Sequence, residues 1–196
     1  MGESSAGADS VAARQAAGQR QSGLAAVDAL WRCAAPYLAL VTAWVAMLGS
    51  LYFSEVRGLV PCGLCWFQRI ILYPLALVIA VGVLRRDKGL PLYVLPLTLL
   101  GIVVSTYHYL VQKTDLFDHA IACNVGVPCS AIYINWLGFV TIPFLALTAA
   151  VIISLCMSAM RAGEWADASK SVPWARVIGC IAAVFAAFAV LYAVRP

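Results

Sequence analysis

Charged side chains are scarce in this sequence. Asp, Glu, Lys and Arg together make up only 11% of its 196 residues, whereas a soluble domain of this length carries about 25%. Hydrophobic residues make up 63%, and they are grouped in long blocks instead of alternating with polar residues. This composition excludes a soluble globular domain and predicts an all-α integral membrane protein.

No cleavable signal peptide is predicted in the N-terminal residues. Residues 1–32 contain no apolar segment followed by a small-residue cleavage site. They are rich in Ala, Gly, Ser and Gln and show little apolar periodicity, and such a segment buries too little surface to become ordered. We therefore expect residues 1–32 to be a disordered cytoplasmic tail, and the first apolar block to act as an uncleaved insertion signal.

Five apolar blocks follow the tail. The first has no charged residue and is long enough, at about 1.5 Å per residue, to cross a hydrocarbon layer roughly 30 Å thick. The blocks cover residues 33–53, 65–84, 90–111, 136–160 and 177–194. We expect the first four to form a four-helix transmembrane bundle over residues 33–160. Residues 161–196 are expected to add a cytoplasmic loop and a fifth, C-terminal transmembrane helix.

Basic residues are few on one side of these blocks. If the N-terminus is cytoplasmic, nine Lys and Arg residues lie on that side and only three, Arg57, Lys113 and Arg195, lie on the other. Since positive charge collects in cytoplasmic loops, residues 54–64 and 112–135 are predicted to lie on the outer face. The basic residues therefore set orientation, and we expect no nucleic-acid partner.

The predicted cytoplasmic loops contain no cysteine. Four of the seven cysteines lie instead in or beside the outer segments, namely Cys62, Cys65, Cys123 and Cys129. Because the two pairs share the oxidising side of the membrane, they could exchange electrons with each other.

Cys62 and Cys65 form a Cys-x-x-Cys pair at the start of the second apolar block. A helix N-terminus favours a thiolate, so this position is typical of a redox dithiol. A structural disulfide and half of a zinc site are the alternatives. Cys123 and Cys129 are separated by the turn-forming sequence Asn-Val-Gly-Val-Pro. The alternatives for this pair are a catalytic disulfide, a structural disulfide that only holds the loop, and the other half of a four-cysteine zinc site.

Three polar residues near the pairs are candidates for binding a ligand. Arg69 lies one helical turn beyond Cys65, and a charge near the apolar layer indicates function unless the side chain only snorkels to the interface. It could stabilise a thiolate or bind a carbonyl oxygen. Gln68 could bind the same ligand or face a neighbouring helix. His108, in a Tyr-His-Tyr sequence, either donates a hydrogen bond to a ligand or belongs to an aromatic belt.

The sequence Pro-Cys-Gly-Leu-Cys-Trp-Phe-Gln-Arg over residues 61–69 resembles the disulfide bond formation protein family of bacterial membranes, DsbB, in its BdbC-type branch. The resemblance covers roughly residues 33–160 and includes the Tyr-His-Tyr sequence and the closely spaced second cysteine pair. It implies a four-helix bundle in the bacterial cell membrane. Such a protein reoxidises a thioredoxin-fold oxidase of the DsbA or BdbD type and passes the electrons to a quinone, ubiquinone or menaquinone.

The resemblance also implies roles for individual residues. Cys65 would be the quinone-proximal cysteine, and Cys62 would exchange with the outer pair. Cys123 would form the mixed disulfide with the partner, while Arg69 and His108 would border the quinone. No metal cofactor is implied. The fifth apolar block lies outside the usual four-helix plan.

Two other functions remain open at this point. One is a vitamin K epoxide reductase-like protein that reduces a quinone, although in such proteins the Cys-x-x-Cys pair belongs to a late span. The other is a non-catalytic membrane scaffold in which disulfides or a zinc ion hold the outer loops together.

Overall fold

The computed structural model describes residues 31, 33–114, 127–160 and 174–194. The expected disordered tail lies almost wholly outside these residues, as do most of the expected loop after residue 160 and Cys123.

Five helices in the described ranges are long and apolar enough to cross a membrane. They are the first helix (Cys33–Val56), α2 (Gly63–Arg85), α3 (Leu90–Lys113), α4 (Ile142–Ala159) and α6 (Trp174–Ala193). The first helix ends in a π-helical turn, η1 (Tyr52–Val56). The described residues contain no strand apart from one isolated bridge. The all-α membrane fold with a fifth helix is therefore confirmed.

The fourth helix begins later than the apolar pattern predicts. It starts at Ile142, whereas the apolar block starts at Trp136. Residues 136–140 form a tight turn in which the backbone N–H of Trp136 donates to the carbonyl of Val140 at 3.0 Å, and the N–H of Val140 donates back at 2.9 Å. Gly138 has a φ of 80° in this turn, a conformation that glycine adopts without strain. Apolar side chains thus continue through a turn that is not helical.

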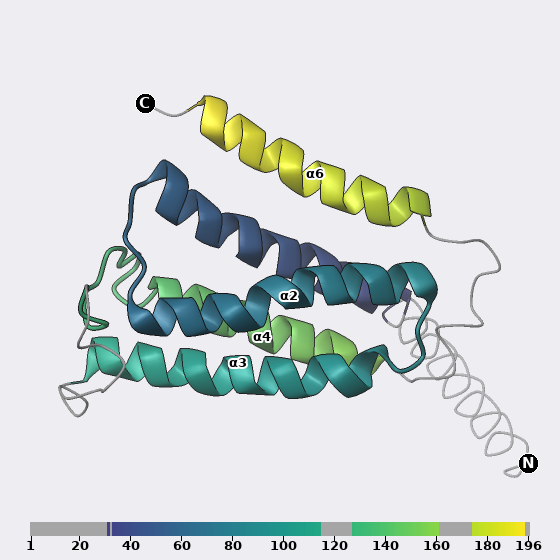
Figure 1. The fold of residues 1–196 in the computed structure, drawn as a ribbon, viewed down its shortest axis with the longest axis horizontal. Coiled ribbons are helices and arrows are strands. Elements are labelled where there is room, and N and C mark those ends of the chain that lie inside the picture. The colour runs from purple at the N-terminus through teal and green to yellow at the C-terminus, as the bar shows by residue number, and fades with distance from the viewer. Residues whose placement is uncertain (1–30, 32, 115–126, 161–173, 195–196) are drawn as a thin grey trace, which may run out of the picture.

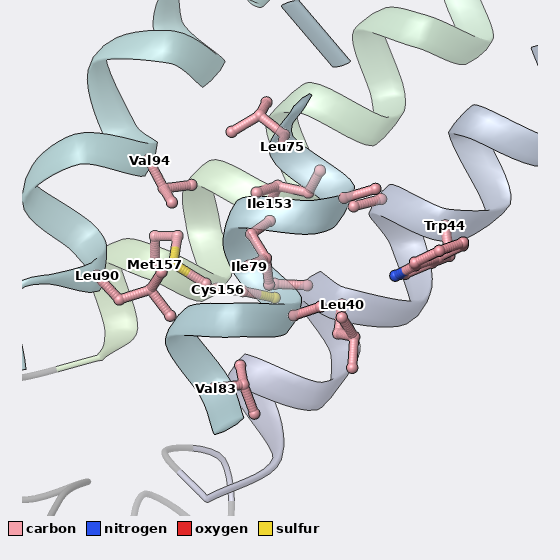
Figure 2. Packing of buried hydrophobic residues seen from close by; sticks show 14 of the residues in the cluster. Leu40, Trp44, Leu75, Ile79, Val83, Leu90, Val94, Ile153, Cys156 and Met157 are labelled. Atoms are coloured by element: carbon pink, nitrogen blue, oxygen red, sulfur yellow. The ribbon is translucent and has the colours of Figure 1, made fainter. Parts of the chain in front are cut away.

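The helices pack around one apolar core (Figures 1 and 2). Most of its fully buried side chains come from the first helix, α2, α3 and α4, including Leu40, Leu75, Ile79, Val94, Ile153 and Met157, and α6 adds Val177. On the first helix Ala35, Ala39 and Ala43 are at most 1% exposed. Their small side chains at four-residue spacing allow neighbouring helices to approach closely.

The turn between α2 and α3 fixes these two helices as an antiparallel pair. Asp87 accepts hydrogen bonds from the Gly89 N–H at 2.8 Å and from the Tyr93 hydroxyl at 2.7 Å. Arg86 ends α2 in the left-handed conformation. As a result, the start of α2 lies beside the end of α3, at the opposite end of the pair from this turn.

Candidate functional site

Cys62 is the N-cap residue of α2. Its backbone is extended, and its Sγ accepts a hydrogen bond from the Cys65 N–H at 3.4 Å. The first N–H groups of a helix have no partner within the helix and carry the positive end of its dipole. The Cys-x-x-Cys pair therefore starts a helix as the sequence predicts, and its first sulfur faces groups that stabilise negative charge.

The two sulfurs of this pair are close but not bonded. Cys62 and Cys65 are free thiols in this structure, and their Sγ atoms are 3.0 Å apart. A disulfide bond is about 2.05 Å long, so the sulfurs need to approach by only about 1 Å to form one. The geometry is that of a dithiol that can be oxidised with little movement of the chain.

His108 lies against Cys62. The imidazole comes from the last part of α3, is fully buried, and places Nε2 3.5 Å from Cys62 Sγ. The hydrogen bond from the Cys65 thiol, together with His108, lowers the pKa of Cys62 to about 4 against the opposing effect of burial. A thiolate is the form that attacks a disulfide. The site therefore holds Cys62 ready for exchange near neutral pH.

Cys129 is buried in the same cluster as Cys62. It is disulfide-bonded and 1% exposed, and the other buried members of this cluster are Leu64 and Val111. Cys123, the other predicted member of the outer pair, lies outside the described residues. The structure thus brings one outer-loop cysteine to the Cys-x-x-Cys pair.

Cys65 faces a different environment. It lines an apolar cavity of about 330 Å³ whose walls come mainly from the first helix, α2 and α4, with Phe188 from α6. Tyr133 closes the cavity from the outer segment, where its hydroxyl donates to the carbonyl of Val60 at 3.0 Å. Ligand pockets in proteins have volumes of about 300–1,000 Å³. The cavity is large enough for the ring of a small organic ligand.

Arg69 lines this cavity and is only partly satisfied. Its Nη2 donates to the carbonyl of Ser50 at 3.1 Å, and its guanidinium lies 5.3 Å from the ring centroid of Trp66. Its Nε is buried without a hydrogen-bond partner in the described part of the chain. An unpartnered buried donor is costly, so the cavity offers a hydrogen bond that an oxygen-bearing ligand would accept.

Gln68 lies where it can contact a ligand in the cavity and also faces a neighbouring helix, the two alternatives given by the sequence. It lines the cavity, and its Nε2 also donates to Ser105 Oγ on α3 at 3.1 Å. His108 is not among the cavity-lining residues. Its role as a ligand contact stays a prediction, and its observed contact is with Cys62.

Sequence reasoning missed Tyr73. Its hydroxyl is buried without a partner among the described residues, and the residue lines the cavity. Cys65, Arg69 and Tyr73 follow one another at four-residue spacing, which places them on one helix face. This spacing could have identified Tyr73 as a further polar residue facing the same cavity as Cys65 and Arg69.

The structure does not support the four-cysteine zinc site considered above. That site needs Cys129 as a thiolate, and Cys129 is in a disulfide. The possible ligand atoms of Cys62, Cys65 and His108 instead lie within 4.8 Å of one another. This is the set that a metal-binding alternative would use.

The fold and the site together define a multi-pass membrane protein with two neighbouring thiols at one end of its helical bundle. The family model of the disulfide bond formation protein DsbB matches residues 32–160. The chain belongs to this family, and it is a disulfide-forming membrane protein.

Curated relatives agree with this assignment. The chain is 49% identical to disulfide bond formation protein C of Bacillus subtilis over 125 residues, which cover 64% of this chain and 91% of the relative. It is 58% identical to a probable disulfide formation protein C of Halalkalibacterium halodurans over 117 residues, or 59% of this chain and 85% of the relative. No solved structure matches the chain significantly.

Proposed function

We propose that this protein is a thiol:quinone oxidoreductase of the bacterial cell membrane. It reoxidises a thioredoxin-fold dithiol oxidase of the DsbA or BdbD type and delivers two electrons to a membrane quinone. In this proposal the N-terminus is cytoplasmic and both cysteine pairs are on the outer face. One observation carries it: Cys62 and the disulfide-bonded Cys129 are buried members of one cluster, while Cys65 packs against that cluster and also lines the cavity that contains Arg69.

The proposed path begins at the outer loop. A thiolate of the reduced partner attacks the Cys123–Cys129 disulfide and forms a mixed disulfide with Cys123. The second partner thiol then displaces Cys123, so that the partner leaves oxidised and the loop pair is left as two thiols. Two electrons and two protons have entered the protein.

The loop pair next reduces the Cys62–Cys65 disulfide. Cys62 and Cys129 are buried members of one cluster, so we assign the attack of a loop thiolate to the Cys62 sulfur, which forms a mixed disulfide with Cys62 and releases Cys65 as a thiolate. As the loop disulfide reforms, Cys62 and Cys65 become the dithiol seen in this structure. Cys62 leaves in the second displacement, when the other loop thiolate attacks the mixed disulfide, and its low pKa makes it a good leaving group in that step.

The cavity fits a quinone by its chemistry. Its walls are mainly apolar, as an isoprenoid quinone requires, and Arg69 Nε and Tyr73 Oη are buried polar atoms without partners in the described residues. Both can donate to a carbonyl oxygen. When bound, a quinone would accept two electrons and two protons while Cys62 and Cys65 return to the disulfide. Arg69 and Gln68 would orient the ring beside Cys65.

Redox energetics supports a final acceptor that is not another thiol pair. A strongly oxidising partner has a potential of about −120 mV, and reoxidation by a dithiol couple near −180 mV would run about 60 mV uphill, or roughly 2.8 kcal/mol. A quinone acceptor can supply the free energy that a second dithiol couple lacks.

The test uses purified full-length protein with a water-soluble quinone and a reduced thioredoxin-fold oxidase. Quinone absorbance and partner thiols are followed together for the wild type, for Cys65→Ser, and for Cys33→Ser as a control. Cys33 is an exposed free cysteine at the start of the first helix. We expect one quinone to be lost for every two partner thiols, and this loss to be abolished only by Cys65→Ser.

The opposite result would favour the scaffold. In that case quinone and partner thiols would both persist with the wild type across several quinones. Purified protein would contain stoichiometric zinc, and Cys62 and Cys65 would resist alkylation until a chelator was added. The ligand set of Cys62, Cys65 and His108 makes this outcome measurable.

A further inference from the structure

Helix α6 lies outside the part of the chain that the family model matches, which ends at residue 160. It packs along the first helix at the edge of the bundle (Figure 1), with the Phe185 ring 5.4 Å from Trp44 and the Phe188 ring 6.3 Å from Tyr52. Only Val177 and Val184 of α6 are buried. Most of α6 therefore contributes little to the buried core, and packing alone does not account for the presence of this helix.

Phe188 reaches the cavity described above. It is the one residue of α6 among the residues that line it. Phe188 lies against Gly49 of the first helix, where an added Cβ would be 3.8 Å from Phe188 Cζ. Gly49 and Phe188 both line the cavity. The aromatic ring thus fills a place in the wall where the first helix offers no side chain.

Phe188 lies close to the backbone carbonyl that binds Arg69. Gly49 is followed by Ser50, whose carbonyl accepts the hydrogen bond from Arg69. Along the first helix, the residues that line the cavity on the other side of Gly49 are Ala46, Val45 and Thr42. Thr42 is about 10 Å from Gly49 along the helix axis at about 1.5 Å per residue. Phe188 therefore lies where the polar end of the cavity passes into its apolar part.

We propose that Phe188 is a specificity-determining residue that contacts the isoprenoid side chain of the quinone where it leaves the ring. This inference rests on the proposed quinone oxidoreductase function. In that role α6 is an additional wall of the quinone site. It recognises the lipid-soluble side chain, while Arg69 and Gln68 recognise the ring.

The experiment compares Phe188→Ala with Phe185→Ala in the full-length protein. Both remove a phenyl ring from α6, and both rings pack on an aromatic residue of the first helix. Only Phe188 lines the cavity. The probes are two benzoquinones with the same ring, one with a ten-carbon side chain and one with none. Binding is measured by quenching of tryptophan fluorescence, and KM and kcat are measured in the coupled assay.

We expect Phe188→Ala to raise Kd and KM for the quinone with a side chain about tenfold, since burial of an aromatic side chain against an apolar ligand contributes on this scale. Values for the quinone without a side chain should change less than twofold, and kcat should be kept. Phe185→Ala should leave both quinones unaffected. Phe188→Leu retains apolar bulk and should fall between wild type and Phe188→Ala. Thermal unfolding of each variant in detergent verifies that it is folded.

Two outcomes would overturn different claims. If the wild type binds and reduces neither quinone, the proposed function fails whatever Phe188 does. If the wild type uses both quinones but Phe188→Ala and Phe185→Ala have equal effects, or if Phe188→Ala affects the two quinones alike, the specificity role of Phe188 is wrong and α6 acts only through packing.

Discussion

His108 Nε2 lies 3.5 Å from Cys62 Sγ, although 46 positions separate the two residues in the chain. The contact exists because α2 and α3 run antiparallel and bring the start of one helix to the end of the other. It places a fully buried imidazole beside the sulfur with the lowered pKa. This relationship can be tested directly through the reactivity of Cys62.

Replacing His108 by Ala should raise the pKa of Cys62 above its value of about 4, because the imidazole is one of the groups that lower it. The hydrogen bond from Cys65 is the larger cause, so the pKa should remain below the ordinary value. Alkylation of Cys62 by a small reagent depends on the thiolate. Its rate in the reduced protein should therefore fall at acidic pH and show a midpoint at higher pH.

The controls for this prediction lie nearby. Tyr109→Phe changes an α3 residue that packs on Phe144 instead of Cys62, and it should leave the midpoint in place. Cys65→Ser keeps a hydroxyl donor for Cys62 and should shift the midpoint less than Cys65→Ala. An unchanged midpoint in His108→Ala would show that the imidazole does not act on Cys62.

Replacing Arg69 by Met should weaken quinone binding without slowing exchange between the partner and the outer-loop pair. The substitution removes the donors that face the cavity, and hydrogen bonds to charged groups contribute about 1.5–3 kcal/mol. We expect KM for quinone to rise about 10- to 100-fold. Rapid mixing with the reduced partner in the absence of quinone measures the exchange step, and a loss of that step would place Arg69 in thiol chemistry instead.

The hydrogen bond from Gln68 to Ser105 should contribute to packing of α2 on α3. Gln68→Leu leaves the Ser105 hydroxyl buried without this partner, and we expect the free energy of unfolding in detergent to fall by about 1–3 kcal/mol. The double variant Gln68→Leu with Ser105→Ala should recover most of that loss. If stability is unchanged but KM for quinone rises, Gln68 serves only the ligand.

Gly82 should be required where α2 meets the start of α3. A Cβ at this position would overlap the Leu90 side chain, so Gly82→Ala should lower the free energy of unfolding by about 1–3 kcal/mol. Gly179→Ala is the matched control, because a Cβ there meets nothing within 4 Å. Leu90→Ala added to Gly82→Ala should restore part of the stability. Equal effects of the two glycine variants would contradict close packing at Gly82.

The spans and the start of α2 were predictable because they depend on local sequence. Long apolar blocks define the helices, and the position of Cys62 before a helical run makes it an N-cap. The start of α4 was not predictable in this way. Apolar residues continue from Trp136 through a turn that is closed by backbone hydrogen bonds, and hydropathy does not distinguish such a turn from a helix.

Contacts between residues on different helices could not be predicted from the sequence either. The four-residue spacing of Cys65, Arg69 and Tyr73 was sufficient to put them on one face. No spacing in the chain relates Phe188 to Gly49, or His108 to Cys62, because these contacts depend on how whole helices pack. The assignments of Cys62, Cys65, Cys123, Cys129, Gln68, Arg69 and His108 to catalysis and ligand binding stay predictions.

The different neighbours of Cys62 and Cys65 have a consequence for how such a protein diversifies. One sulfur meets an imidazole and a loop cysteine, and the other meets an apolar chamber formed by other helices. Under the proposed function, substitutions around the chamber would adapt the protein to a different lipid-soluble oxidant while the surface that meets the partner is kept. Changes in the loop would likewise accommodate a new partner, so the two halves of the proposed reaction would be free to evolve separately.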